Sequence, residues 1–178
     1  GTGGVAFLIG VVLRYFFHIP KRNVFIFGVN DDKLAVFKTL GTTINYMHGK
    51  QNVHNTFSKV FECVGRSHIH ITMNTALQLV RAGGVIGVLG ISEIPWQIPI
   101  ERLVNWQITV MGLTRSTPAD YPRTMRFLQK PDVSSVIEKY LISPDIFTIT
   151  SCEDLTAAFD FAGTSQAIGR ILLKWNAS

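Results

Sequence analysis

The first residues of the chain carry the pattern with the clearest chemical meaning. Gly1, Gly3 and Ala6 fit the spacing G-x-G-x-x-G/A, with Gly4 and Val5 between them. In this pattern the first glycine permits a tight turn, the second lets the backbone approach a pyrophosphate, and the small last residue lets a helix pack closely on a strand. The amino end of that helix attracts phosphates through its free N–H groups and its dipole. For this motif taken alone, a glycine-rich turn without a ligand is the alternative.

The end of the next apolar strand indicates which dinucleotide would bind. An NAD site usually carries Asp or Glu there, which accepts hydrogen bonds from the adenosine ribose. Gly28 stands at this position, with Asn30 and Lys33 close behind. A carboxylate would repel a 2′-phosphate by roughly a few kcal/mol at an effective dielectric constant of about 20, whereas Asn30 and Lys33 can donate to it. The pattern predicts NADP(H) rather than NAD(H), unless Asp31 or Asp32 supplies the carboxylate from a shifted register.

Other reactive side chains offer weaker patterns. His68 and His70 have a spacing that could chelate a metal on a strand, but no Cys, Asp or Glu joins them, which favours surface histidines. Cys63 ends a strand and has no basic partner, so it is expected to line the adenosine pocket rather than to act as a nucleophile. Arg115 and Arg170 can each pair with a phosphate or be solvated. The sequence therefore predicts no catalytic residue and no metal ligand within this chain.

Alternating apolar runs supply the scaffold for these residues. Strands that end in glycine alternate with helices, which predicts an α/β fold with a doubly wound parallel Rossmann sheet. Loops are expected at 47–58 and at the proline-containing stretch 91–106. The expected strands are 24–28, 43–46, 59–65, 85–90 and 107–112, and the expected helices are 5–17, 31–40 and 71–81.

After Gly112 the alternation stops. The residues that follow predict a second unit that is only partly present, and Ser151 with Asp154 matches a capping box at the start of its last helix. The expected elements are helices at 121–130 and 133–141, an isolated strand at 147–150, a helix at 155–161 and a closing strand at 168–175.

Composition excludes several classes of protein. Of 178 residues, 47% are hydrophobic and 16% charged, which excludes a disordered chain. The net charge of +5 comes without a basic block, which argues against nucleic acid as a partner. Two distant cysteines indicate a reducing compartment, the cytoplasm. The apolar stretch 5–17 is too short for a membrane span, contains Arg14 and lacks the features of a signal peptide, so we expect a helix buried against the sheet.

Three glycine-bearing stretches resemble a known family. Residues 1–6, 61–65 and 83–90 resemble the cofactor half of the medium-chain, zinc-type alcohol dehydrogenases, and 168–174 resembles that family's carboxyl end. Within the family, shorter stretches resemble the ribulose-5-phosphate reductases, which use NADPH to make ribitol 5-phosphate for CDP-ribitol, a precursor of ribitol teichoic acid or capsule. These shorter stretches are 24–34, 88–93, 115–116 and 174–176.

The resemblance implies a division into two units. Residues 1–113 would form an NADP-binding Rossmann domain, and 114–178 the C-terminal segment of a GroES-like catalytic domain. The N-terminal part of that catalytic domain, which in the family carries the zinc ligands and most substrate contacts, would be absent. The first sheet strand, expected between the strands that end at Gly28 and Gly65, would also be missing, leaving unpaired backbone groups on its neighbours. We therefore expect a fragment of a longer protein that is inactive alone.

The resemblance also implies the cofactor contacts. Residues 1–6 would contact the pyrophosphate, and 28–33 the 2′-phosphate side. Residues 63–65 would border the adenosine, and 89–91 would flank the nicotinamide ribose, with 113–114 nearby. The expected residues are Gly1, Gly3, Gly4, Val5, Ala6, Gly28, Asn30, Lys33, Cys63, Val64, Gly65, Leu89, Gly90, Ile91, Leu113 and Thr114.

The resemblance further implies a reaction and an assembly. In the complete enzyme, zinc held by the absent part would polarise the ketone of a sugar phosphate while NADPH delivers a hydride. Subunits would form a homodimer through the strand at 107–111, with neither nucleic acid nor membrane as a partner. Two alternatives stay open, namely another zinc-type polyol or sugar dehydrogenase and a non-catalytic nucleotide-binding module.

Overall fold

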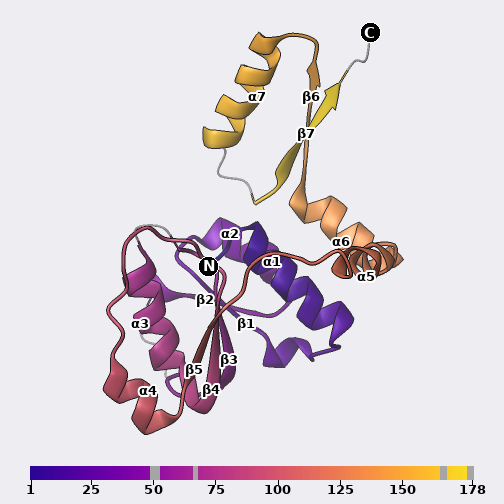
Figure 1. Ribbon diagram of the computed structural model, residues 1–178. Coiled ribbons are helices and arrows are strands. Elements are labelled where there is room, and N and C mark those ends of the chain that lie inside the picture. The colour runs from indigo at the N-terminus through magenta and orange to yellow at the C-terminus, as the bar shows by residue number, and fades with distance from the viewer. Residues whose placement is uncertain (49–52, 66–67, 165–167, 176–178) are drawn as a thin grey trace.

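The computed structural model describes residues 1–48, 53–65, 68–164 and 168–175. Figure 1 shows a larger body that runs from α1 to β5 and a smaller unit of β6, α7 and β7, with α5 and α6 between them. In chain order the elements are α1 (Gly4–Val11), η1 (Val12–Phe16), η2 (Lys21–Asn23), β1 (Phe25–Gly28), α2 (Asp31–Phe37), β2 (Thr42–Asn45), η3 (Tyr46–His48), β3 (Phe57–Glu62), α3 (Ile69–Leu79), β4 (Val80–Val88), α4 (Ile100–Trp106), β5 (Thr109–Gly112), α5 (Asp120–Leu128), α6 (Pro131–Leu141), β6 (Ile142–Ile149), α7 (Cys152–Thr164) and β7 (Arg170–Trp175).

All strand pairs in the described residues are parallel, which confirms the predicted α/β fold. β1 pairs with β2, and β3, β4 and β5 form a second sheet in that order. No backbone pairing joins β1 to β3 within the described ranges, as expected for strands that are not sheet neighbours. Aromatic rings cross this boundary, because the Phe57 ring lies 5.0 Å from that of Phe25 and 5.8 Å from that of Phe27, centroid to centroid.

The predicted helix at 5–17 forms, but not as one regular helix. α1 ends at Val11 and continues as the π-helical turn η1, in which the Phe17 N–H donates to the Val12 carbonyl. The Arg14 guanidinium then donates to the Ile19 carbonyl and fixes the chain reversal. Within the described residues, no helix is both long and apolar enough to cross a bilayer.

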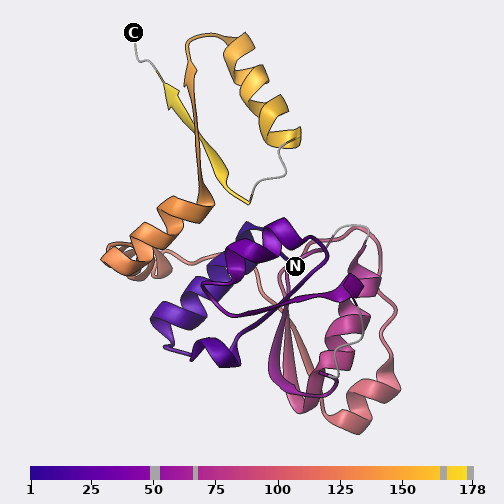
Figure 2. The same ribbon diagram turned by 180° about the vertical axis from the view of Figure 1, so that it is seen from behind.

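The core around α1 draws on distant parts of the chain. Phe7 and Val11 of α1 are completely buried. They belong to one cluster with Phe127 of α5, Val133 of α6 and Ile168 just before β7. Figures 1 and 2 both show α5 and α6 beside this end of the body. Residues on both sides of position 113 therefore share a core, and the division into domains stays a prediction.

The predicted boundary between α3 and β4 is wrong. The helix was expected to end at Arg81 and the strand to begin at Val85, but α3 ends at Leu79 and β4 begins at Val80. A bulge absorbs the additional residues, because the register along β3 jumps from Phe57↔Val80 to Lys59↔Val85. Gly83 lies within the bulge at a φ of +68°, a conformation that glycine adopts without strain.

The stretch expected to be a loop before β5 contains a helix, α4. Pro99 precedes its first turn, where a proline leaves no hydrogen bond unmade. Leu103 and Trp106 pack against the core cluster of α3 and β4. The Arg102 guanidinium stacks 3.4 Å from the centre of the Trp106 ring and donates to the Leu77 carbonyl, so it ties α4 to the end of α3.

The C-terminal unit is a parallel strand pair joined by α7. The strand expected to be isolated, at 147–150, is longer and pairs with β7 along its length. The predicted capping box is present, since the Asp154 Oδ2 accepts from the Ser151 N–H and the Asp154 N–H donates to the Ser151 Oγ. The helix it caps starts at Cys152 rather than Leu155 and reaches Thr164, so the predicted bounds were too short.

Candidate nucleotide site

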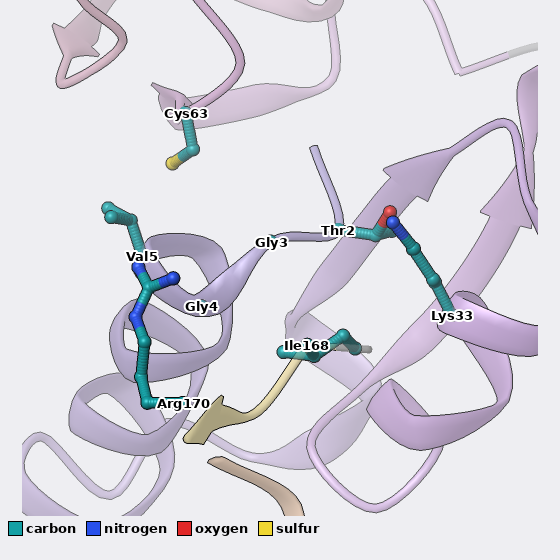
Figure 3. Close-up of a pocket in the computed structure, with 8 residues that line it drawn as sticks. All are labelled: Thr2, Gly3, Gly4, Val5, Lys33, Cys63, Ile168 and Arg170. Carbon is teal, nitrogen blue, oxygen red and sulfur yellow. The ribbon is translucent and has the colours of Figure 1, made fainter. Parts of the chain in front are cut away.

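A pocket of about 300 Å³ lies at the amino end of α1. It collects residues from four elements far apart in the sequence: the turn before α1, the first turn of α2, the end of β3 and the start of β7. Figure 3 shows the Lys33 and Arg170 side chains on opposite sides of the Gly3–Gly4 backbone. The lining residues are Thr2, Gly3, Gly4, Val5, Lys33, Cys63, Ile168 and Arg170.

The amino end of α1 is open to an anion. Gly3 is the N-cap in an extended conformation, and no described side chain caps it. The first N–H groups of α1 therefore lack helical partners. The Arg170 guanidinium adds a full positive charge here, because a Cβ built on Gly4 would lie 3.7 Å from its Nη2. Helix dipole and guanidinium together make this a suitable place for an anion.

Gly28 is required by its neighbours. A Cβ at this position would lie 2.5 Å from the Thr2 Cγ2 and 3.0 Å from the Leu34 Cδ2. A side chain at position 28 would therefore displace Thr2, which occupies the space above the end of β1. The sequence has no carboxylate at position 28, and the structure leaves no room for one while Thr2 keeps its place.

The first turn of α2 holds the other polar residues that lie near the end of β1. The Asn30 Oδ1 caps the helix by accepting from the Lys33 N–H at 2.9 Å, while the Lys33 side chain reaches the pocket. Asp31 turns toward β2, where its carboxylate accepts from the Asn45 Nδ2 at 2.8 Å and lies 3.7 Å from the His48 Nε2.

The turns after β3 and β4 touch each other. Gly65, at a φ of +61°, packs so closely on the second turn that a Cβ would lie 2.5 Å from the Ile91 carbonyl oxygen. Gly1 lies against the first turn, since its own Cβ would lie 2.7 Å from the Val64 Cγ2. After β5, the Leu113 N–H donates to the Val88 carbonyl and Thr114 is exposed.

The structure brings part of the predicted site into this pocket. Five of the expected residues line it, and Ala6 packs partly buried against the α1 core. The remaining expected residues do not line the pocket, and the cofactor contacts of all the expected residues stay predictions. These remaining residues are Gly1, Gly28, Asn30, Val64, Gly65, Leu89, Gly90, Ile91, Leu113 and Thr114.

Three lining residues were not among the expected contacts. Thr2 occupies a variable position of the glycine motif, where the residue type carries no signal. Ile168 and Arg170 reach the pocket only because β7 pairs with β6, beyond the reach of any local spacing rule. The sequence pointed to Arg170 only as one of two possible phosphate partners.

No metal centre is evident in the parts of the chain that the structure describes. Within those ranges, no three His, Cys, Asp or Glu residues come together in a way that could hold a metal ion. His68 and His70 lie at the start of α3, a helix rather than a strand, so the spacing that suggested chelation does not apply. No step of the chemistry is assigned to zinc in this chain.

Burial determines the reactivity of Cys63. It raises the pKa of the Cys63 thiol to about 11, so at pH 8 roughly one thiol in a thousand is ionised. Cys152, by contrast, is exposed. We expect iodoacetamide at pH 8 to modify Cys152 well before Cys63. Peptide mass mapping at successive times measures the two rates of modification. Cys152→Ser should remove the fast labelling and Cys63→Ser should leave it; equal rates at the two cysteines would contradict this expectation.

Known proteins resemble this chain along its whole length. Ribulose-5-phosphate reductase 1 of Staphylococcus aureus is 28% identical over 176 residues, which cover 98% of this chain and 50% of that protein. The ribulose-5-phosphate reductase of Bacillus spizizenii shows the same identity and coverage. The crystal structure of S. aureus TarJ in complex with NADPH matches with a TM-score of 0.89 at 25% identity, over 99% of this chain and 54% of that one. This chain thus spans about half the length of the curated relatives it matches.

A family model gives the broader assignment. The model described as zinc-binding dehydrogenase matches residues 19–130, more than half of the chain. The matched stretch runs from the turn before β1 to the end of α5, and so contains both parallel sheets of the larger body. The chain therefore belongs to the zinc-binding dehydrogenase family.

Proposed function

We propose that this chain is the NADP(H)-binding half of an oxidoreductase that reduces a ketose phosphate, D-ribulose 5-phosphate to D-ribitol 5-phosphate, for CDP-ribitol and teichoic acid or capsule synthesis. The observation that carries the proposal is the pocket at the amino end of α1, placed between Lys33 and Arg170 and next to a glycine at position 28. The names of the S. aureus and B. spizizenii relatives and the NADPH complex of TarJ support it.

In this proposal each edge of the pocket holds one part of the dinucleotide. The amino end of α1 and Arg170 bind the pyrophosphate, and Lys33 with the amide nitrogen of Asn30 binds the 2′-phosphate. Asp31 is already engaged by Asn45, which weighs against Asp31 as the carboxylate of the shifted-register alternative and leaves Asp32 as its candidate. The turns at 63–65 and 89–91, with Leu113 and Thr114, hold the adenosine and the nicotinamide ribose.

The chemistry divides between the cofactor and the protein. Bound NADPH supplies the hydride that reduces a carbonyl to an alcohol. The residues of this chain bind the dinucleotide, orient it and keep its phosphates from solvent. Two free cysteines suit a reducing compartment, and we propose the cytoplasm.

The test uses the native protein that contains this sequence. NADPH and NADH are titrated separately, and oxidation of NADPH is followed with ribulose 5-phosphate, xylulose 5-phosphate or sorbitol. We expect tighter binding of NADPH and turnover with ribulose 5-phosphate. Preference for NADH contradicts the cofactor assignment, turnover with another polyol or ketose alone identifies a different dehydrogenase, and binding without turnover identifies a non-catalytic module.

We also propose a homodimer joined through residues 107–111. β5 pairs with β4 on one edge, and no described strand pairs with the other, where Thr109 and Met111 are exposed. Met111→Lys should place like charges across the two-fold axis and weaken the dimer by about tenfold, measured by sedimentation equilibrium. Met47→Lys is the control, because Met47 lies outside β5 and is more exposed than Met111 (72% against 46%). Equal dissociation of both variants, or of neither, contradicts the interface.

A further inference from the structure

Glu62, the last residue of β3, is a buried carboxylate with an unusual set of contacts. Its side chain is only 4% exposed, and carboxylates are seldom buried so completely. Its Oε1 accepts hydrogen bonds from the N–H groups of Val64 (2.8 Å) and Gly65 (3.1 Å) and from the Thr72 hydroxyl (2.9 Å). One oxygen thus fixes the turn that follows β3 and ties it to α3.

The second oxygen of Glu62 faces the turn that follows β4. Oε2 is buried and has no hydrogen-bond partner among the described residues. It presses against Gly90, where a Cβ would lie 2.3 Å from it. The main chain of Glu62 reaches the same turn, because its carbonyl accepts from the N–H groups of Leu89 at 2.8 Å and Gly90 at 3.2 Å.

Close backbone contact makes these two turns one unit. A Cβ at Gly90 would also lie 2.4 Å from the Gly65 backbone nitrogen, and a Cβ at Gly65 would lie 2.6 Å from the Ile91 nitrogen. Neither glycine can change without separating the turns. Burying a carboxylate oxygen without a hydrogen-bond partner costs free energy of folding. Its position between two such turns therefore indicates a role beyond the folding of β3.

We propose that Glu62 is a positioning residue that holds the turns at 63–65 and 89–91 at one fixed separation. The inference rests on the proposed function, in which the first turn borders the adenosine and the second the nicotinamide ribose. A single dinucleotide then spans both turns, and the carboxylate sets the distance between its two contact points. Glu62 touches neither the cofactor nor the substrate in this role.

The test compares four variants of the native protein. Glu62→Leu removes every acceptor at similar size, Glu62→Gln keeps one carbonyl oxygen, and Thr72→Val removes a single donor. Thr75→Val is the matched control, because the only hydrogen bond of the Thr75 hydroxyl among the described residues goes to the Ile71 carbonyl in the same helix. Each variant is titrated with NADPH and with adenosine 2′,5′-bisphosphate, which lacks both the nicotinamide and its ribose.

We expect Glu62→Leu to raise the Kd for NADPH by about tenfold or more and to lower kcat. The Kd for adenosine 2′,5′-bisphosphate should rise less, because that ligand reaches only the turn at 63–65. Glu62→Gln should stay within about threefold of the wild type, Thr72→Val should show a smaller loss in the same direction, and Thr75→Val no change. A purely structural carboxylate would weaken both ligands equally.

Several outcomes overturn the inference. One is a folded Glu62→Leu protein that binds both ligands as the wild type does. A second is a folded Glu62→Leu protein that loses affinity for both ligands to the same extent. A third is a Glu62→Gln protein that loses as much NADPH affinity as Glu62→Leu. If Glu62→Leu does not fold, Thr72→Val decides by the same comparison of ligands. If the wild type binds no NADPH, the proposed function fails, and hydrogen exchange still tests the contacts: Val64 and Gly65 amides should exchange faster in Thr72→Val than in Thr75→Val.

Discussion

Replacing Arg170 by glutamine is expected to weaken NADPH binding by roughly ten- to a hundredfold. The guanidinium lies beside Gly4 at the amino end of α1, so removing it takes away a full charge and a forked pair of donors from the expected place of the pyrophosphate. The helix end alone contributes only partial charges. Fluorescence titration of the native protein with NADPH at fixed ionic strength measures the loss.

Two further variants serve as controls for that result. Arg170→Lys keeps the charge but not the planar fork, and should fall between glutamine and the wild type. Arg81→Gln makes the same change in charge at the start of β4, the opposite end of the parallel sheet, and should leave the Kd unchanged. Unchanged binding by Arg170→Gln would mean that Arg170 is solvated, the alternative that the sequence leaves open.

Gly28→Asp is expected to reverse the choice of cofactor. A carboxylate about 5 Å from the 2′-phosphate costs about 3 kcal/mol per unit charge at an effective dielectric constant near 20, or roughly a hundredfold in the Kd for NADPH. The same carboxylate can accept hydrogen bonds from the ribose hydroxyls of NADH and should strengthen its binding. The ratio of the two dissociation constants is the quantity to measure.

The steric cost of any side chain at position 28 needs its own control. Thr2 must move to admit even a Cβ, so part of the loss in Gly28→Asp comes from size rather than charge. Gly28→Asn has nearly the same shape without the charge. If the asparagine variant loses as much NADPH affinity as the aspartate variant and gains nothing for NADH, the carboxylate explanation of the cofactor preference is wrong.

The scaffold was predictable where the apolar pattern is local and strong. The short runs that became β1 and β3 are bounded by glycine or by polar residues, and such runs have few alternatives to a buried strand. α4 was missed because Pro95 and Pro99 mark a loop, and the helix has only 7 residues, too few for its apolar positions to show a sustained helical period. The early start of β4 was missed because the bulge around Gly83 has the glycine signal of a helix end.

The site was predictable only where its residues lie close together in the sequence. Gly3 and Gly4 of the glycine motif and Lys33 of α2 follow from spacing within the first 33 residues, and all three line the pocket. Arg170 reaches the pocket through the pairing of β6 with β7, a long-range event without a local code. The contacts of Glu62 depend on two turns meeting in space, which no spacing rule within one strand describes.

The shared core of α1 has a consequence for synthesis on the ribosome. Phe7 and Val11 are translated more than a hundred residues before their partners Phe127, Val133 and Ile168. At about 5–20 residues per second, this delay lasts roughly 10–30 s. Throughout that interval the nascent chain presents an apolar helix with part of its packing surface not yet translated. The core around α1 therefore cannot be completed before Ile168 has been translated, and until then the apolar face of the helix lacks part of its packing partners.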